Sequence, residues 1–181
     1  MDAAPTLYTE RMILRPLELA DAAGIQQQFA HWEVVQYLNA LVPWPYPADG
    51  ALTYLRDIAL PAIAAGKEWH WSIRLKSAPE QLIGNISLMD DPDNNRGFWI
   101  APQWQRQGLM AEASAVVTHY WFETLGREVL RVPKAAPNIG SRRLSQRGGM
   151  RLVRTDEGRF VGGLFAREIW EITREEWRNR Q

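Results

Sequence analysis

The sequence predicts one α+β domain in which helices flank a mostly antiparallel sheet of about seven strands. Three observations support this fold class. The spacing of apolar residues changes from helical to alternating near residue 68. Three alternating runs then follow one another with short polar connections, which is typical of an antiparallel meander. A strand–helix–strand crossover and a closing hairpin come after the meander, so the predicted order is β-α-α-β-β-β-α-β-α-β-β.

The first third of the chain combines one short strand with helices. The run MILRPL is typical of a strand, whereas ELADAAGIQQQFA and VVQYLNA have helical character. Three prolines in LVPWPYPADG favour an extended loop, because proline fixes φ and lacks an N–H group. Pro61 is expected to interrupt the helix that follows. The expected elements are a strand at 12–17, a helix at 18–30 with a helical tendency that continues over 34–40, a loop at 41–50 and a helix at 50–65.

The rest of the chain carries the meander and the crossover. EWHWSIRL places Trp69, Trp71 and Ile73 on one face of a strand, and DDPDNN is a turn by composition. The expected elements are strands at 68–75, 81–89 and 96–100, a helix at 108–125, a strand at 129–132, a helix at 140–147, hairpin strands at 150–158 and 164–173, and a helix at 174–180. We expect residues 1–181 to form a single domain, because this length suits one hydrophobic core.

The composition argues against several classes of function. The 21 Lys and Arg residues balance 21 Asp and Glu residues, so no net positive field favours nucleic acid or an anionic membrane. Cysteine is absent and the three histidines are widely spaced, so no metal site is expected. No apolar run reaches the ~20 residues that span a bilayer, and the N-terminus lacks a signal-peptide pattern. We therefore expect a cytoplasmic protein.

The stretch WQRQGLMAEA, residues 104–113, places a glycine and several polar side chains at the start of a predicted helix. The free amides and the dipole of a helix N-terminus can bind phosphate. Gly108 would give a phosphate access to the backbone, and Arg106 would add a permanent positive charge. The nucleotide-triphosphate loop and the dinucleotide fingerprint are both missing. Alone, the segment fits either a phosphate site or a polar turn.

QRQGLM, residues 105–110, resembles the Q/R-x-x-G-x-G/A motif of the GNAT acyltransferase superfamily, with Met110 in place of the last small residue. The continuation MAEA resembles the ribosomal-protein-alanine N-acetyltransferase (Rim-type) branch of that superfamily. Further segments that resemble this branch are TERMILRPLELAD (9–21), PWPYP (43–47), GNISLM (84–89), GFWIAPQWQRQG (97–108) and NIGSRRLSQRGGMRLV (138–153). Their ordered combination covers nearly the whole chain.

The resemblance implies that acetyl-CoA binds in a cleft where the fourth and fifth strands splay apart. The pantetheine arm would contact backbone groups of Trp99, Ile100 and Ala101. The pyrophosphate would lie on the loop and helix start formed by Gln105, Arg106, Gln107, Gly108, Leu109 and Met110. At the sixth motif position the methionine side chain would have to turn away from the phosphate.

Two positions near residue 140 match the family's next motif. Asn138 corresponds to an asparagine that contacts the pantetheine arm, and Ser141 to a serine near the thioester sulfur. Without the resemblance, both would be interpreted as helix-capping residues. Arg142 and Arg143 face either the 3′-phosphate of the cofactor or solvent, and we include Arg143 among the implied cofactor contacts.

The implied reaction is direct attack of an unprotonated amine on the thioester in a ternary complex, without a metal. A backbone N–H of the fourth strand would hold the oxyanion. The glutamate that often precedes the strand's glycine as a base is missing, because Asn95 and Arg96 precede Gly97 here. Asp90, Asp91 and Asp93 are expected to be solvated turn residues rather than the base. Glu68 and His70 are weak candidates for the base. The base is therefore unassigned, and a non-catalytic acyl-CoA-binding domain is the alternative.

Aromatic side chains flank the acceptor side in the family that the chain resembles. The residues implied as substrate contacts are Trp32, Trp44, Tyr46 and Trp71. Such a site would suit a small amphipathic amine or an amino acid better than a polycation. The acceptor classes that the resemblance leaves open are a small-molecule amine, an amino acid and a protein or peptide N-terminus. Dimerisation is common in such folds, and the sequence leaves the oligomeric state open.

Overall fold

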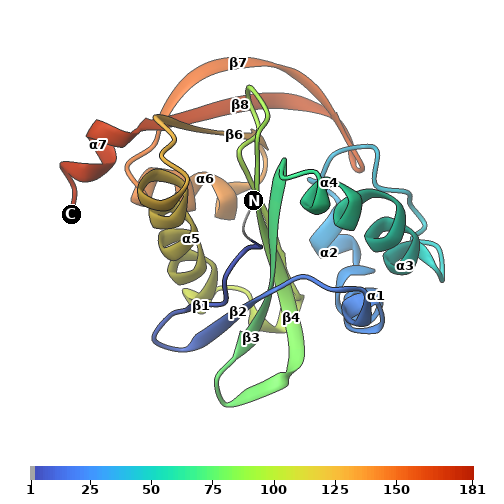
Figure 1. Ribbon diagram of the computed structural model, residues 1–181. Helices are drawn as coiled ribbons and strands as arrows, with labels where there is room; N and C mark the ends of the chain where they lie inside the picture. Colours follow the sequence, from blue (N-terminus) through green and yellow to red (C-terminus); the bar gives the residue numbers. More distant parts are fainter. Residues whose placement is uncertain (1–2) are drawn as a thin grey trace.

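The computed structural model describes residues 3–181 as two antiparallel sheets with helices on both sides (Figure 1). The five-stranded sheet has the order β1-β2-β3-β4-β5, and the three-stranded sheet has the order β6-β8-β7. The strands are β1 Leu7–Tyr8, β2 Met12–Pro16, β3 Glu68–Leu75, β4 Ala78–Met89, β5 Arg96–Ile100, β6 Val129–Ala135, β7 Arg151–Phe160 and β8 Gly163–Thr173. The predicted α+β class is confirmed, with the strands divided between two sheets.

The helices cover both faces of the five-stranded sheet. They are α1 Ala22–Phe29, α2 Trp32–Val35, α3 Gly50–Tyr54, α4 Leu60–Ala64, α5 Leu109–His119, α6 Ile139–Arg147 and α7 Arg174–Arg178. In Figure 1, α1 to α4 lie on one side of this sheet and α5 and α6 on the other, while the hairpin β7–β8 arches over both. No helix in residues 3–181 is long and apolar enough to cross a membrane.

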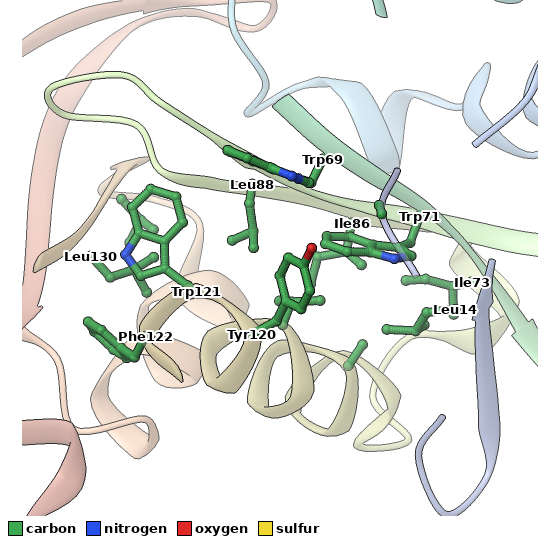
Figure 2. Packing of buried hydrophobic residues seen from close by; sticks show 14 of the residues in the cluster. Leu14, Trp69, Trp71, Ile73, Ile86, Leu88, Tyr120, Trp121, Phe122 and Leu130 are labelled. Atoms are coloured by element: carbon green, nitrogen blue, oxygen red, sulfur yellow. The ribbon is translucent and has the colours of Figure 1, made fainter. Parts of the chain in front are cut away.

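The main core lies between the five-stranded sheet and α5. Alternation along β3 turns Trp69, Trp71 and Ile73 toward that helix, where the ring of Trp71 meets Tyr120 at 5.4 Å (Figure 2). Trp121 of the turn after α5 packs into the same cluster. The predicted alternation is confirmed, and it leaves the other face of the sheet to polar side chains and a smaller apolar cluster under α1 and α3.

The two sheets separate at β5 and β6. No strand ladder joins these two neighbours within residues 3–181, and the main link is at one end, where the Asn95 amide donates to Arg131 O at 2.8 Å. Asn95 Oδ1 in turn accepts from the Arg131 amide at 2.8 Å. Beyond this link the facing edges of β5 and β6 carry no pairing with each other, which gives the splayed arrangement expected of the fourth and fifth predicted strands.

In the structure, two of the helical segments differ in detail from the prediction. The helix expected at 50–65 divides into α3, a π-helical turn Leu55–Ala59, and α4, with Pro61 in the first turn of α4. Proline lacks an N–H and crowds the carbonyl four residues earlier, and a wider turn accommodates both effects. The helical tendency expected over 34–40 does not continue past the end of α2 at Val35. Beyond it, Gln36 O and Leu38 O accept from the amides of Gly162 and Val161 in the β7–β8 turn.

Candidate functional site

The unpaired edge of β5 is the first part of the site. The Ala101 amide donates to Ile83 O at 2.9 Å, and Ala101 O accepts from the Trp104 amide at 3.0 Å. Backbone groups alternate in direction along an antiparallel strand. The amides of Phe98 and Ile100 therefore point to the open edge facing β6, and those of Trp99 and Ala101 point toward β4. Of the three residues expected to contact the cofactor through the backbone, Ile100 alone presents its amide at the open edge. Trp99 and Ala101 direct theirs toward β4, and Phe98, which sequence reasoning missed, shares the open edge with Ile100.

The loop after β5 turns sharply before the helix. Gly108 has φ 76° and Arg106 has φ 62°, and Arg106 is the one non-glycine residue with positive φ in residues 3–181. Strain of this kind concentrates at functional sites. The side-chain Nε2 atoms of Gln105 and Gln107 donate to backbone oxygens nearby, to Ile100 O at 3.1 Å and to Gln103 O at 3.0 Å respectively. These two side chains hold the loop rather than projecting free donors, whereas Arg106 is exposed.

The start of α5 presents unpaired backbone donors. Gly108 is the N-cap residue, and the first helical hydrogen bond runs from the Glu112 amide to Gly108 O at 3.2 Å. The amides of the intervening turn therefore have no partner within the helix. Leu109 is buried and Met110 packs partly into the core, so neither side chain covers these amides. The departure of Met110 from the motif is thus accommodated by the core.

A cation that the sequence did not reveal lies beside this loop. Arg11 Nη1 donates to Gln107 O at 3.0 Å, and Arg11 Nε lies 3.4 Å from Glu112 Oε2. A Cβ added at Gly108 would stand 3.4 Å from Arg11 Nη2. Arg11 comes from the turn between β1 and β2, so only tertiary structure places it here. In the sequence, the one indication of a role for Arg11 is its place in the segment TERMILRPLELAD, which resembles the family.

The start of α6 follows closely after β6, the strand on the other side of the open edge. Asn138 caps the helix, with its Oδ1 accepting from the Ser141 amide at 3.3 Å. This capping role does not exclude a cofactor contact, because the amide nitrogen of the side chain stays available. Arg142 Nε pairs with Glu168 Oε1 at 2.8 Å, and Arg143 is exposed. Of the two arginines, only Arg143 is therefore free to reach a phosphate.

Lys134 is the second functional candidate that sequence reasoning missed. Its ammonium is almost fully buried and donates to Ser141 O at 2.9 Å, to Ser141 Oγ at 3.0 Å and to Ser145 Oγ at 2.5 Å. Burial is the main cause that lowers the pKa of Lys134 to about 7; the charge of nearby Arg96 acts in the same direction, and Glu168 opposes the shift. The one sequence signal was its place on the apolar face of β6, two residues after Val132.

The carboxylates considered as bases lie in different settings. Asp91 Oδ1 accepts from the Asp93 and Asn94 amides at 3.0 Å, which is the turn role expected for this stretch. Asp90 and Asp93 pair with arginines on other elements. His70 is buried, and its Nε2 lies 2.6 Å from Glu68 Oε2. Within residues 3–181, no group of three or more His, Cys, Asp or Glu residues is placed to hold a metal ion.

A cavity lies where the loop before α3 meets the β7–β8 hairpin. Its volume is about 380 Å³, and its lining residues are Ala40, Val42, Pro43, Trp44, Arg159, Phe160, Val161, Gly163 and Leu164. We call it the hairpin pocket. Trp44 stands 5.6 Å from the ring of Trp32, and both are about two-fifths exposed. The hairpin residues were missed, because only tertiary folding brings them to this loop.

The other aromatic candidates are placed differently. Tyr46 is half-buried against Phe29 at 5.0 Å, and burial raises the pKa of Tyr46 to about 12. Trp71 is fully buried between the sheet and α5, and its Nε1 donates to Pro5 O at 2.8 Å (Figure 2). The expectation for Trp71 is wrong, because strand alternation turns it to the core face, so it is a core residue rather than a substrate contact.

Comparisons with known proteins agree with this arrangement. The model of the acetyltransferase (GNAT) domain family matches residues 11–151. The uncharacterized N-acetyltransferase p20 of Bacillus licheniformis is 28% identical over 168 residues, which cover 86% of this chain and 91% of that protein. Ribosomal-protein-S5-alanine acetyltransferase from Vibrio fischeri superposes with a TM-score of 0.79 at 14% identity, covering 96% of this chain and 99% of that one. RimL, a ribosomal L7/L12 alpha-N-protein acetyltransferase solved with coenzyme A, superposes with a TM-score of 0.77 at 15% identity, covering 93% of this chain and 98% of that one.

Proposed function

The chain belongs to the GNAT acetyltransferase family, and we propose that this acetyl-CoA-dependent N-acetyltransferase transfers the acetyl group directly to a primary amine in a ternary complex. The observation that carries the proposal is the continuity of three features. The open edge of β5 leads into a loop with two positive-φ residues, and that loop ends at the free amides of α5. A thioester arm and a pyrophosphate need this combination of donors in this order.

The residues present fit acetyl-CoA. We assign the pantetheine arm to the open-edge amides of Phe98 and Ile100, with the side chain of Asn138 opposite them. The pyrophosphate is assigned to the turn Gly108 to Met110, where a helix dipole and unpaired amides favour an anion. Arg106 and Arg11 add permanent positive charge beside the turn.

The chemistry requires an unprotonated amine. An α-amino group has a pKa of about 7.7–8.0, so freeing it of its proton at pH 7 costs only ~1 kcal/mol. A lysine side chain with a pKa of about 10.4 would cost roughly 4.6 kcal/mol. Since the glutamate that often serves as the family's base is missing beside Gly97, we propose a weakly basic acceptor, such as an amino acid or a peptide N-terminus.

Ser141 is proposed as the proton donor to the leaving sulfur. When the amine nitrogen bonds to the carbonyl carbon, the C–S bond breaks and its electron pair stays on sulfur. The proton that the nitrogen loses replaces the one that the serine gives to sulfur, so the serine ends the step protonated. In its charged form Lys134 can only donate, so Ser141 Oγ accepts from it, and the serine proton remains free to be given away. Lys134 thus acts as a positioning residue that also supports negative charge developing on the serine oxygen.

The hairpin pocket is the proposed acceptor site. Trp44 and Leu164 give it apolar walls, Arg159 adds a cation, and no Asp or Glu is among the residues that line it in the described chain. Amines with an apolar body therefore fit it better than polyamines, whose several positive charges would find no partner. The names of the structural neighbours mention ribosomal proteins, which is consistent with a peptide N-terminus as one acceptor.

Calorimetry with acetyl-CoA tests the cofactor assignment. We expect one site with a Kd near the micromolar range, and the absence of binding would overturn the proposal. The alternative is a non-catalytic acyl-CoA-binding domain, which the missing glutamate beside Gly97 favours. Steady transfer of acetyl groups to any amine would exclude that alternative.

A further inference from the structure

A cavity of about 330 Å³ lies between α5 and α6, and it is lined from α5 mainly by Ser114, Ala115, Thr118 and His119. Ala111 in the first turn of α5 also lines the cavity, but the other four residues occupy the middle and end of the helix, beyond the turn Gly108 to Met110 assigned to the pyrophosphate. The other walls are largely apolar and come from Leu130, Leu144, Ile172 and Trp177. We call this space the interhelical cavity.

Arg96 lies against this cavity without an anionic partner. Its side chain is only 8% exposed, and its Nη1 donates to Thr118 Oγ1 at 2.9 Å. Nη2 makes a longer contact of 3.8 Å with Met150 Sδ, and Nε has no acceptor in residues 3–181. Ser114 Oγ, also buried and on the cavity wall, has no partner in the same residues. Buried guanidinium groups are normally paired, so this arrangement needs an explanation.

The surroundings do not neutralise this charge. Lys134 is close enough to Arg96 for their charges to repel, and burial lowers the pKa of Arg96 to about 10. The buried carboxylate nearby, Glu168, is already paired with Arg142. No Asp or Glu side chain lines the cavity in the described chain, while Arg147 and Arg180 do line it. An anion entering this space would therefore meet positive charge from several elements.

We propose that the interhelical cavity binds a small organic monocarboxylate, with its carboxylate on Arg96 and Ser114 and its apolar body among Leu144, Ile172 and Trp177. A guanidinium matches the planar geometry of a carboxylate and forms strong charge-assisted hydrogen bonds with it. The apolar walls favour an organic body over a hydrated inorganic anion, since binding pockets typically combine apolar walls with a few polar anchors. None of the residues that line this cavity is among those assigned above to the cofactor or to the acceptor.

Titration calorimetry with benzoate at constant ionic strength tests the proposal, with benzyl alcohol as the uncharged control. We expect saturable binding of one benzoate and no binding of the alcohol. Arg96→Met should weaken benzoate binding at least about tenfold, because it removes a charge-assisted contact. No benzoate binding to the wild type, or equal binding to the Arg96→Met variant, would overturn the proposal.

Ala115→Phe provides a second variant that keeps Arg96. Ala115 is exposed on α5 at the cavity, so a phenyl ring there should block the space without disturbing the core. Loss of benzoate binding in this folded variant supports the site even if Arg96→Met does not fold, and unchanged binding contradicts it. Tighter binding of inorganic phosphate than of benzoate would overturn the ligand class. Displacement of benzoate by acetyl-CoA would assign the anion to the cofactor site instead.

Discussion

The Nζ atom of Lys134 lies 3.0 Å from Ser141 Oγ, at the start of the helix that follows β6. The lysine comes from β6 and the serine from the first turn of α6, so one buried hydrogen bond ties the strand to the helix. Because the same ammonium also donates to Ser141 O, it fixes both the backbone and the side chain of that serine.

The free energy of unfolding should depend on pH through Lys134. Its pKa is about 7 in the folded protein, whereas the ordinary value for a lysine side chain is 10.5, so between these values the unfolded chain binds the extra proton. Stability should therefore rise with pH above 7, by at most ~1.4 kcal/mol per pH unit. Urea unfolding from pH 6 to 9 should show this slope in wild type and in Lys67→Met, which alters an exposed lysine. The slope should be lost in Lys134→Met, and its persistence there would contradict the buried-ammonium account.

Ser141→Ala should lower kcat while leaving acetyl-CoA binding nearly unchanged. A lost proton donor reduces the rate of C–S cleavage, and a loss of at least about tenfold is expected. Ser145→Ala is the matched control, since Ser145 also accepts from Lys134 but lies one turn further along α6. Steady-state kinetics and calorimetry check both variants. Equal effects of the two substitutions would mean that they act through packing around Lys134.

Gly108→Glu should abolish acetyl-CoA binding without unfolding the protein. The change brings a negative charge to the anion-binding turn and next to Arg11, and both effects oppose a pyrophosphate. Gly126→Glu is the control, because Gly126 also has positive φ, at 67°, but nothing lies within 4 Å of an added Cβ. Calorimetry should find wild-type affinity in the Gly126 variant. Normal binding by a folded Gly108 variant would show that the phosphate assignment is wrong.

Asn138→Ala should reduce both stability and cofactor affinity. Loss of the cap on α6 should cost about 1 kcal/mol of unfolding free energy, and loss of the amide side chain should raise the Kd for acetyl-CoA. Thr173→Ala removes a comparable cap, which accepts from the Glu176 amide at 3.2 Å on α7. Chemical denaturation should show similar losses in the two variants, and calorimetry should show a change only for Asn138. A cap-only role predicts unchanged affinity in both.

Trp44→Ala should raise KM for amines with an apolar body by about two- to tenfold, as expected for the loss of one aromatic contact. The KM for acetyl-CoA should stay the same, because Trp44 is not among the residues assigned to the cofactor. Tyr8→Ala, at an exposed aromatic residue on β1, should change neither constant. An acceptor KM unaffected by Trp44→Ala would place the acceptor elsewhere.

The strands and the cofactor loop could be predicted from the sequence because their signals are local. The alternation of Trp69, Trp71 and Ile73 marks a half-buried strand, and the residues after Trp104 carry a helix start with a glycine. Trp71 was assigned to the acceptor side through the family resemblance, and alternation alone did not say which face of the strand meets the core. In the structure both faces of β3 are buried, so the two faces differ in polarity but not in exposure to solvent.

The residues that were missed depend on pairing between distant segments. Arg11 reaches Gln107 across 96 positions, and Phe98 gains its free amide only because β4 pairs with the alternate residues of β5. VVQYLNA favours helix locally, but backbone hydrogen bonds to the β7–β8 turn replace it after Val35. Lys134 is polar on an apolar face, and only the serines of α6 make its burial tolerable.

An acceptor screen with acetyl-CoA tests the central claim most directly, with free thiol read continuously and the amine product identified by mass spectrometry. The panel should include amino acids, peptides with free N-termini, small aromatic amines and spermidine. We predict acceptor-dependent release of one thiol for each acetylated amine, with weakly basic apolar amines preferred over spermidine. Acetyl-CoA binding without transfer to any amine would contradict the claim and leave a non-catalytic acyl-CoA-binding domain.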